Sequence, residues 1–167
     1  MAQEAGKYCK ETFIATKGMM INPAILFASA SPLEQAIGEY HIVFLHFPIV
    51  LFTLALICDL RSFFMRQEDL TWGTWFLIGG VIACIPTIFT GLAAGASLDP
   101  NPILEKHETL AYTTAISASA YAGFRIAAMR WKIAFPIAFY VAFSVLLVAL
   151  VSWTADYGGL VVRLKGP

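Results

Sequence analysis

Long apolar segments separated by short polar connections dominate the pattern along this chain. Three of them, at residues 41–60, 74–98 and 133–154, each reach the roughly 20 helical residues that cross a bilayer core of about 30 Å. A fourth segment, 107–128, is milder because serines and threonines interrupt it, and such residues suit a helix that packs among other helices. The pattern predicts an all-α fold: a polytopic membrane protein with a four-transmembrane-helix bundle.

The polar segments divide the chain into a tail and one transmembrane domain. Residues 1–39 are expected to form an N-terminal tail with a short interfacial segment, and residues 40–167 are expected to form the four-helix domain. Ser31 followed by Pro32 has the form of an N-cap and a first helical position, which predicts a helix start there. No internal repeat is visible in the sequence.

Composition excludes several classes of partner and cofactor. The chain is 59% hydrophobic and 13% charged, about half the charged share of an ordinary soluble domain. Its net charge is zero, so nothing indicates nucleic acid or an anionic surface as a partner. The long apolar segments make lipids expected partners. The three cysteines are far apart and no Cys-x-x-Cys-His sequence occurs, which excludes a covalently attached c-type haem on this chain.

The distribution of basic residues predicts the orientation in the membrane. Those at one side of the predicted helices are Arg61, Arg66, Arg125, Arg130 and Lys132, and those at the other are Lys106, Arg163 and Lys165. Cytoplasmic loops carry an excess of Lys and Arg, so the termini and the histidines are expected on the outer face. Arg125 is expected to extend to the inner headgroups, and no charge is expected at mid-membrane.

The three histidines are the candidate cofactor ligands, because each lies where an apolar segment begins. His41 and His46 open the first predicted helix and His107 opens the third. A histidine within a lipid-embedded helix is costly unless it is ligated or paired, and two at one membrane depth are what a bis-imidazole haem requires. His46 and His107 are therefore predicted as axial ligands of a haem iron, with His41 as a further cofactor-binding residue. Alternatively, the histidines bond to loop backbone or reach the headgroups.

Glycines and an arginine at the same membrane face are further candidate cofactor contacts. Gly91 and Gly95 form a small-xxx-small face that lets another helix, or a flat cofactor, approach the backbone closely. Arg163 is expected at the histidine face, where it either pairs with haem propionates or is solvated. Ahead of it, Gly158-Gly159 predicts that the last helix ends and that a short extended tail follows.

The order of these motifs resembles that of the DUF2231 family of bacterial membrane proteins. The shared features are His46-Phe-Pro, Asp59, Thr90-Gly91-Leu-Ala-Ala-Gly95 with Asp99, His107, and Gly158-Gly159-Leu-Val-Val-Arg163. The resemblance covers roughly residues 40–166 and implies a four-helix membrane module. Some members are joined to c-type cytochrome modules, which implies electron transfer at an outward-facing site. Val162 departs from the family pattern, in which a tyrosine is more usual before the arginine.

Together these features predict a b-type cytochrome subunit with no catalytic residues of its own. One haem b held by His46 and His107 would carry single electrons between a quinol or a partner subunit and an outer-face c-type cytochrome. The expected setting is a larger respiratory or photosynthetic membrane complex, with quinone as a second candidate cofactor. The alternative is a haem-free structural subunit that stabilises such a complex, in which the histidines are interfacial hydrogen-bonding groups.

Overall fold

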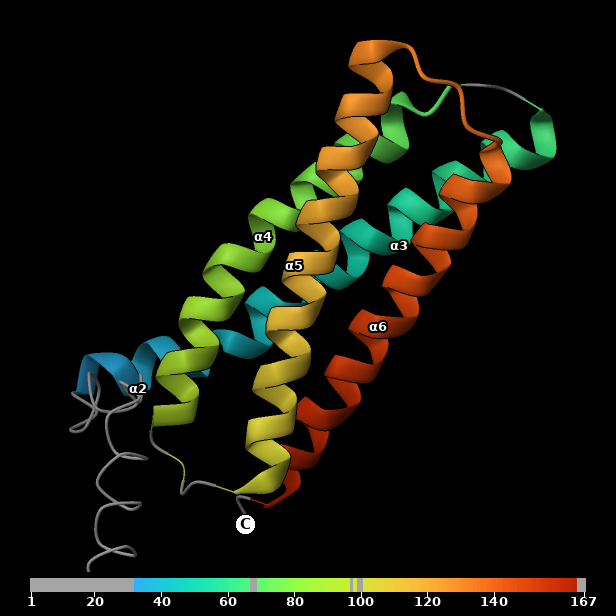
Figure 1. Cartoon of the computed structure of the whole chain (residues 1–167). Helices are drawn as coiled ribbons and strands as arrows, with labels where there is room; N and C mark the ends of the chain where they lie inside the picture. The colour runs from blue at the N-terminus through green and yellow to red at the C-terminus, as the bar shows by residue number, and fades with distance from the viewer. Residues whose placement is uncertain (1–31, 67–68, 97, 99–100, 165–167) are drawn as a thin grey trace, which may run out of the picture.

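The computed structural model describes residues 32–66, 69–96, 98 and 101–164, which form five α-helices (Figure 1). The helices are α2 Pro32–Glu39, α3 His41–Met65, α4 Thr71–Ala96, α5 Pro102–Trp131 and α6 Ile137–Leu164. The predicted all-α fold is confirmed in these residues, and Pro32 opens a helix as expected. Of the tail and interfacial segment predicted over residues 1–39, residues 1–31 with the N-cap Ser31 lie outside the described residues, and the rest form α2.

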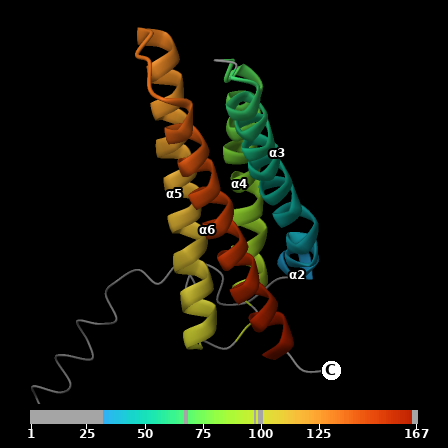
Figure 2. The same cartoon turned by 90° about the vertical axis from the view of Figure 1, so that its right-hand side faces the viewer.

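The four long helices pack side by side as two hairpins, α3–α4 and α5–α6 (Figures 1 and 2). Helix α3 also packs against α6, and α4 against α5. Among the described residues α3 does not pack against α5, nor α4 against α6, so these two pairs are diagonal across the bundle. Helix α2 crosses α4 where Gly38 lies against Ala94. This end, where α3 and α5 begin, is called the histidine end below, and the other is called the opposite end.

Three helical segments of the described chain are long and apolar enough to cross a membrane. They are Ala36–Met65, Thr71–Ala96 and Ile137–Arg163. Helix α5 has 30 residues, enough to span a bilayer core by length, but its many hydroxyl side chains lower its hydropathy. This lower hydropathy of α5 agrees with the weaker apolar pattern expected for the segment 107–128, which α5 contains.

Several helix ends differ from the predicted ones. Helix α3 continues beyond residue 60 to Met65, and α6 begins at Ile137 rather than at residue 133. The predicted helix end at Gly158-Gly159 is wrong, because α6 continues to Leu164. Glycine weakens an isolated helix by about 1 kcal/mol relative to alanine. Here, however, Gly158 packs against the ring of His107, a contact that an alanine would obstruct.

Residues at the helix ends satisfy backbone groups that have no partner within the helix. Arg66 and Lys132 end α3 and α5 in the left-handed conformation, with φ of 52° and 54°, and donate their N–H groups to carbonyls of the last turn. Asn101 caps α5 by accepting two backbone N–H groups. Asp69 accepts the N–H of Thr71 at 2.9 Å. Hydrogen bonds from Thr71 stabilise this carboxylate and hold the pKa of Asp69 below its usual range.

Close packing of α3 on α4 depends on one glycine beside a large aromatic ring. Phe52 is 1% exposed and belongs to the central apolar cluster with Leu77 and Ala118. Its ring occupies the space where a side chain at Gly80 would lie. At the neighbouring Gly79, an added Cβ would lie 3.7 Å from the side chain of Leu51, which is an ordinary contact distance.

We therefore expect Gly80→Ala to destabilise the protein by about 1–3 kcal/mol, because the added methyl group overlaps the buried Phe52 ring. Gly79→Ala is the matched control, and it should be neutral or slightly stabilising because alanine favours the helix. Thermal unfolding of both variants in the same detergent checks this expectation. Equal melting temperatures for the two variants would contradict it.

Candidate functional site

Two of the three histidines meet at the histidine end, inside the bundle. The rings of His41 on α3 and His107 on α5 have centroids 6.5 Å apart and planes inclined by 79°. Both side chains are half-buried. Because α3 and α5 are diagonal helices that do not pack on each other, the two rings reach toward each other across the space between all four helices.

Each of these rings is anchored through Nδ1 to a backbone carbonyl of the other helix in its own hairpin. Nδ1 of His41 lies 3.1 Å from the carbonyl oxygen of Thr87, and Nδ1 of His107 lies 3.0 Å from that of Thr154. A carbonyl oxygen only accepts, so Nδ1 carries the proton and donates it. In the neutral ring, Nε2 then keeps its lone pair. This Nδ1–H···O=C arrangement is the one that orients histidines which bind metals through Nε2.

The residue that anchors His41, Thr87, also contacts α3 beside Pro48, the most buried residue of the His46-Phe-Pro motif. Proline has no N–H and leaves the carbonyl four residues earlier without its helical partner. That carbonyl belongs to Phe44, and it lies 3.1 Å from the hydroxyl of Thr87, which shares its single proton between Phe44 and the Ala83 carbonyl at 2.8 Å. Thr87 therefore binds α3 twice, with its hydroxyl at Phe44 and with its carbonyl at His41.

Glycines let both rings lie directly on the neighbouring helices. A Cβ at Gly91 would lie 2.9 Å from Cε1 of His41, and a Cβ at Gly158 would lie 3.0 Å from Cε1 of His107. Both distances are shorter than an ordinary carbon–carbon contact of about 3.5–4.0 Å. Gly95 faces α5 instead, where Glu108 is its nearest neighbour. Of the predicted small-residue pair, Gly91 therefore adjoins a histidine and Gly95 serves helix packing.

His46 and Arg163 lie away from this ring pair. His46 is exposed on the outer side of α3, and its Nδ1 bonds to the carbonyl of Ile42 one turn earlier. The ring that the structure brings to His107 is that of His41, because five residues of helix turn His41 and His46 to different sides. Arg163 is exposed near the end of α6, at the histidine end as predicted.

A second polar cluster lies about 27 Å farther along α3, since 18 residues at 1.5 Å each separate His41 from its central carboxylate. Asp59 and Arg125 form a bidentate ion pair, with Nη1 donating to Oδ2 at 2.7 Å and Nη2 to Oδ1 at 2.9 Å. Asp59 is 0% exposed and Arg125 is 1% exposed. The expectation that Arg125 extends to the headgroups is wrong, because its carboxylate partner holds it inside the bundle.

The remaining hydrogen bonds of this ion pair connect all four long helices. Arg125 also donates to the Thr74 hydroxyl at 3.1 Å, to the Tyr121 hydroxyl at 3.3 Å and to the Leu70 carbonyl at 3.2 Å. All five guanidinium N–H groups therefore have acceptors. Ser144 on α6 donates to Asp59 at 2.6 Å. Asp59 lies six residues before the end of α3 at Met65, so this compensated pair is near the opposite end of the bundle rather than at its middle.

Comparison with known proteins gives the family. The family model described as "Predicted membrane protein (DUF2231)" matches residues 39–166. The chain belongs to the DUF2231 family. This confirms the resemblance seen in the sequence motifs, and the match covers all four long helices. No curated protein and no solved structure matches the chain.

In this DUF2231 protein the two hairpins repeat one arrangement of polar residues. The histidine is followed after 18 residues by a charged residue and after 25 by the left-handed residue that ends the helix, in His41–Asp59–Arg66 and in His107–Arg125–Lys132. In each partner helix, the threonine that anchors the ring precedes the glycine under it by four residues, at Thr87–Gly91 and at Thr154–Gly158. The likeness is one of positions rather than residue types, because Asp59 corresponds to Arg125.

The sequence contained signals for residues of this site that were not recognised. Thr-x-x-x-Gly occurs at 87–91 and at 154–158, and its repetition after the two histidines could have singled out both anchors. Gly158 was instead interpreted as a helix end. The role of Pro48 needed the neighbouring helix, because only Thr87 shows which group replaces the lost hydrogen bond.

Removing one partner of the buried ion pair is expected to be far more harmful than removing both. Arg125→Met leaves Asp59 buried and unpaired, which should cost about 3–5 kcal/mol of stability. Adding Asp59→Leu to that variant should restore more than half of the loss, because no buried charge remains. Thermal unfolding of the single variant, the double variant and wild type measures this. A double variant no more stable than Arg125→Met would contradict the interpretation.

Proposed function

We propose that this protein is a membrane-embedded b-type cytochrome subunit that binds one haem b through His41 and His107. The observation that carries the proposal is the pair of inward-facing imidazole rings, each anchored through Nδ1 to a backbone carbonyl. The proposal keeps the predicted cofactor and His107, and it replaces His46 by His41 as the second axial ligand.

The spacing of the rings fits two ligands on opposite sides of one metal ion. A metal–nitrogen bond is about 2.0–2.1 Å, and the ring centre lies somewhat more than 1 Å beyond the nitrogen. A metal ion held between the two Nε2 atoms would therefore separate the ring centres by about 6.3 Å. The observed separation is 6.5 Å. Two imidazoles on a tetrahedral ion would lie closer together, because the angle at the metal would be smaller.

The number of protein ligands also favours haem over a bare metal ion. Among the described residues, no three His, Cys, Asp or Glu side chains gather as a metal-binding group. A structural or catalytic zinc ion takes three or four protein ligands. Haem iron needs only two axial ligands, because the porphyrin supplies the other four. When bound, haem supplies reversible one-electron chemistry whose potential depends on axial ligands and burial.

The chain's own residues hold and orient the ligands. Thr87 and Thr154 fix the tautomer and direction of the two rings, and hydrogen bonding at Nδ1 makes Nε2 a better donor to iron. Gly91 and Gly158 keep the space beside the rings free of side chains. Arg163, exposed at the same end, is the proposed partner of the haem propionates.

For the membrane, we propose that α5 crosses together with α3, α4 and α6 as a four-helix transmembrane bundle. Its exposed hydroxyl groups Thr109, Thr113 and Ser119 donate to carbonyls four residues earlier in their own helix, which satisfies them in the absence of water. The charge within the span, Arg125, is buried and paired. A bilayer therefore meets no unsatisfied polar group on these three side chains.

The distribution of exposed charge supports a bacterial inner-membrane location with the histidine end outside. Arg61, Arg66, Arg130 and Lys132 are exposed at the opposite end, where the positive-inside rule places the cytoplasm. A haem at the histidine end would then exchange electrons near the outer surface, with a quinol or partner subunit on one side and a c-type cytochrome on the other. This setting agrees with a role inside a respiratory or photosynthetic complex.

A reduced-minus-oxidised absorption spectrum of the purified full-length protein tests the proposal. Wild type should show a b-type α-band, and both His41→Ala and His107→Ala should lose it because a bis-imidazole iron needs both ligands. His46→Ala is the matched control on the same helix and should keep the band. A flat spectrum from folded wild type would favour a haem-free accessory subunit, and loss of the band in His46→Ala alone would sink the assignment to His41.

Gly158, which lies against the ring of His107, should affect haem binding, whereas its neighbour Gly159 should not. Gly158→Ala displaces the ring of His107, and we expect haem retention to weaken by about tenfold, as when other orienting groups of a metal site are lost. Gly159→Ala is the control, because an added Cβ there meets no atom within 4 Å. Haem-to-protein ratio after purification measures both. Equal ratios in the two variants would contradict the proposed position of the ring.

A further inference from the structure

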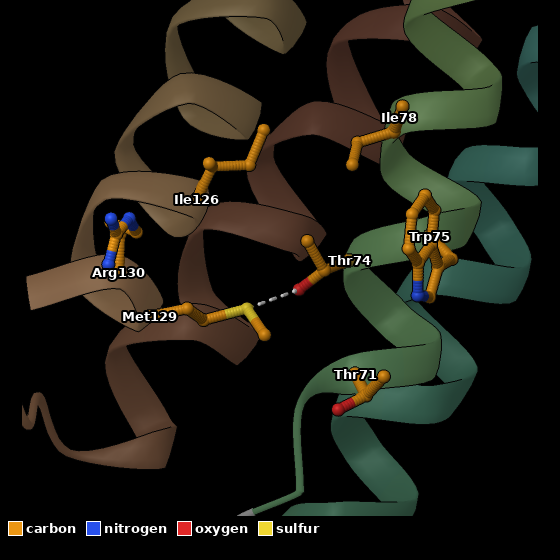
Figure 3. A pocket seen from close by; sticks show the side chains of 7 residues that line it. All are labelled: Thr71, Thr74, Trp75, Ile78, Ile126, Met129 and Arg130. Atoms are coloured by element: carbon orange, nitrogen blue, oxygen red, sulfur yellow. Dashed lines mark hydrogen bonds between the residues drawn. The ribbon is translucent and has the colours of Figure 1, made fainter. Parts of the chain in front are cut away.

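A groove between α4 and α5 opens at the opposite end of the bundle, far from the histidines. It is about 430 Å³ in volume, and its lining is mostly apolar. Figure 3 shows Ile126 and Ile78 on facing helices above, with Met129 reaching toward Thr74 across the floor. Arg130 and Trp75 stand at its sides (Figure 3). The side chains that line it are Thr71, Thr74, Trp75, Ile78, Ile126, Met129 and Arg130.

The rim of this groove belongs to the most basic surface among the described residues. Arg61, Arg66, Arg130 and Lys132 are exposed at this end, whereas Asp69 is the one exposed carboxylate of the described residues there. Asp59 is buried and neutralised by Arg125. An occupant with an anionic headgroup and an apolar chain would therefore match both the rim and the interior. Cytoplasmic leaflets contain such anionic lipids.

We propose that this groove binds one anionic phospholipid, with its phosphate at Arg130 and an acyl chain against Ile78, Ile126 and Met129. Trp75 is 64% exposed and lies beside the groove, where an indole at the headgroup level fits a membrane–water interface. The lipid would close the seam between α4 and α5, and so join the two hairpins from outside where the Asp59–Arg125 pair joins them from within. This site is independent of the proposed haem.

A quinone is the less suitable occupant on grounds of distance. Thr74 in the groove is 17 residues from Gly91 beside His41, which is about 25 Å along α4. Electron tunnelling falls exponentially with distance, so a quinone here would exchange electrons only slowly with a cofactor at the histidine pair. The groove also offers a cation at its rim, which a neutral quinone ring does not require.

Native mass spectrometry of the delipidated full-length protein, titrated with phosphatidylglycerol or phosphatidylcholine, tests the proposal. Wild type should bind one phosphatidylglycerol in preference to phosphatidylcholine. Arg130→Gln should weaken phosphatidylglycerol binding about fivefold, the effect of one basic residue on an anionic lipid. Ile126→Trp should fill the groove and remove this binding. The controls are Arg66→Gln, another exposed cation at this end, and Ile116→Trp, another exposed isoleucine of α5; both should bind as wild type does.

The other outcomes overturn the proposal. Equal weakening by Arg66→Gln and Arg130→Gln would mean diffuse attraction to a basic surface, and equal binding of the two lipids would remove the role of the headgroup. Displacement of the lipid by inorganic phosphate would assign the site to a free anion, and one-for-one displacement by ubiquinone would assign it to a quinone. Arg130 is exposed, so Arg130→Gln should fold even where Ile126→Trp does not, and melting temperatures without lipid check this.

Discussion

The ion pair between Asp59 and Arg125 is the interaction on which the assembly of the two hairpins depends. It joins α3 to α5, two diagonal helices that do not pack on each other, through a network that also takes Thr74 from α4 and Ser144 from α6. In a membrane, helices gain little from burying apolar surface against each other, since lipid is equally apolar. A fully hydrogen-bonded charge pair supplies a specific attraction instead, because neither partner can leave the other without a large desolvation cost.

At the histidine end, too, polar side chains inside the bundle are hydrogen-bonded within the chain. Each imidazole donates Nδ1–H to a carbonyl within its own hairpin, so the backbone satisfies one nitrogen of each ring. The diagonal helices thus meet twice, once through Asp59 and Arg125 and once through two rings 6.5 Å apart. At the first meeting the chain supplies both charges. At the second it supplies two imidazole rings, the pair on which the proposed haem site rests.

The repeated spacing in the two hairpins explains how one chain makes both meetings. Positions 18 residues apart on an α-helix are five turns apart and lie on the same face, so a histidine that faces the bundle centre places the charged residue toward the centre as well. This holds for both α3 and α5. Asp59 and Arg125, each 18 residues after its histidine, therefore lie at matching depths in the bundle. Because Asp59 is negative and Arg125 is positive, the two side chains attract each other. Two identical charges at these positions would repel.

The sequence alone determined the helical architecture and the family, because apolar length, proline and asparagine turns and the family motifs are local properties. It placed His107, His41, Gly91 and the α2 start, and it identified the DUF2231 family. It could not select His41 over His46, since both lie in the same apolar segment and only the position of α4, with Thr87 bonded beside Pro48, decides which ring turns inward. Likewise it took Arg125 for a surface residue and Gly158 for a helix end. Their true roles depend on Asp59 and His107, partners 66 and 51 residues away in the chain, which only the tertiary structure brings into contact.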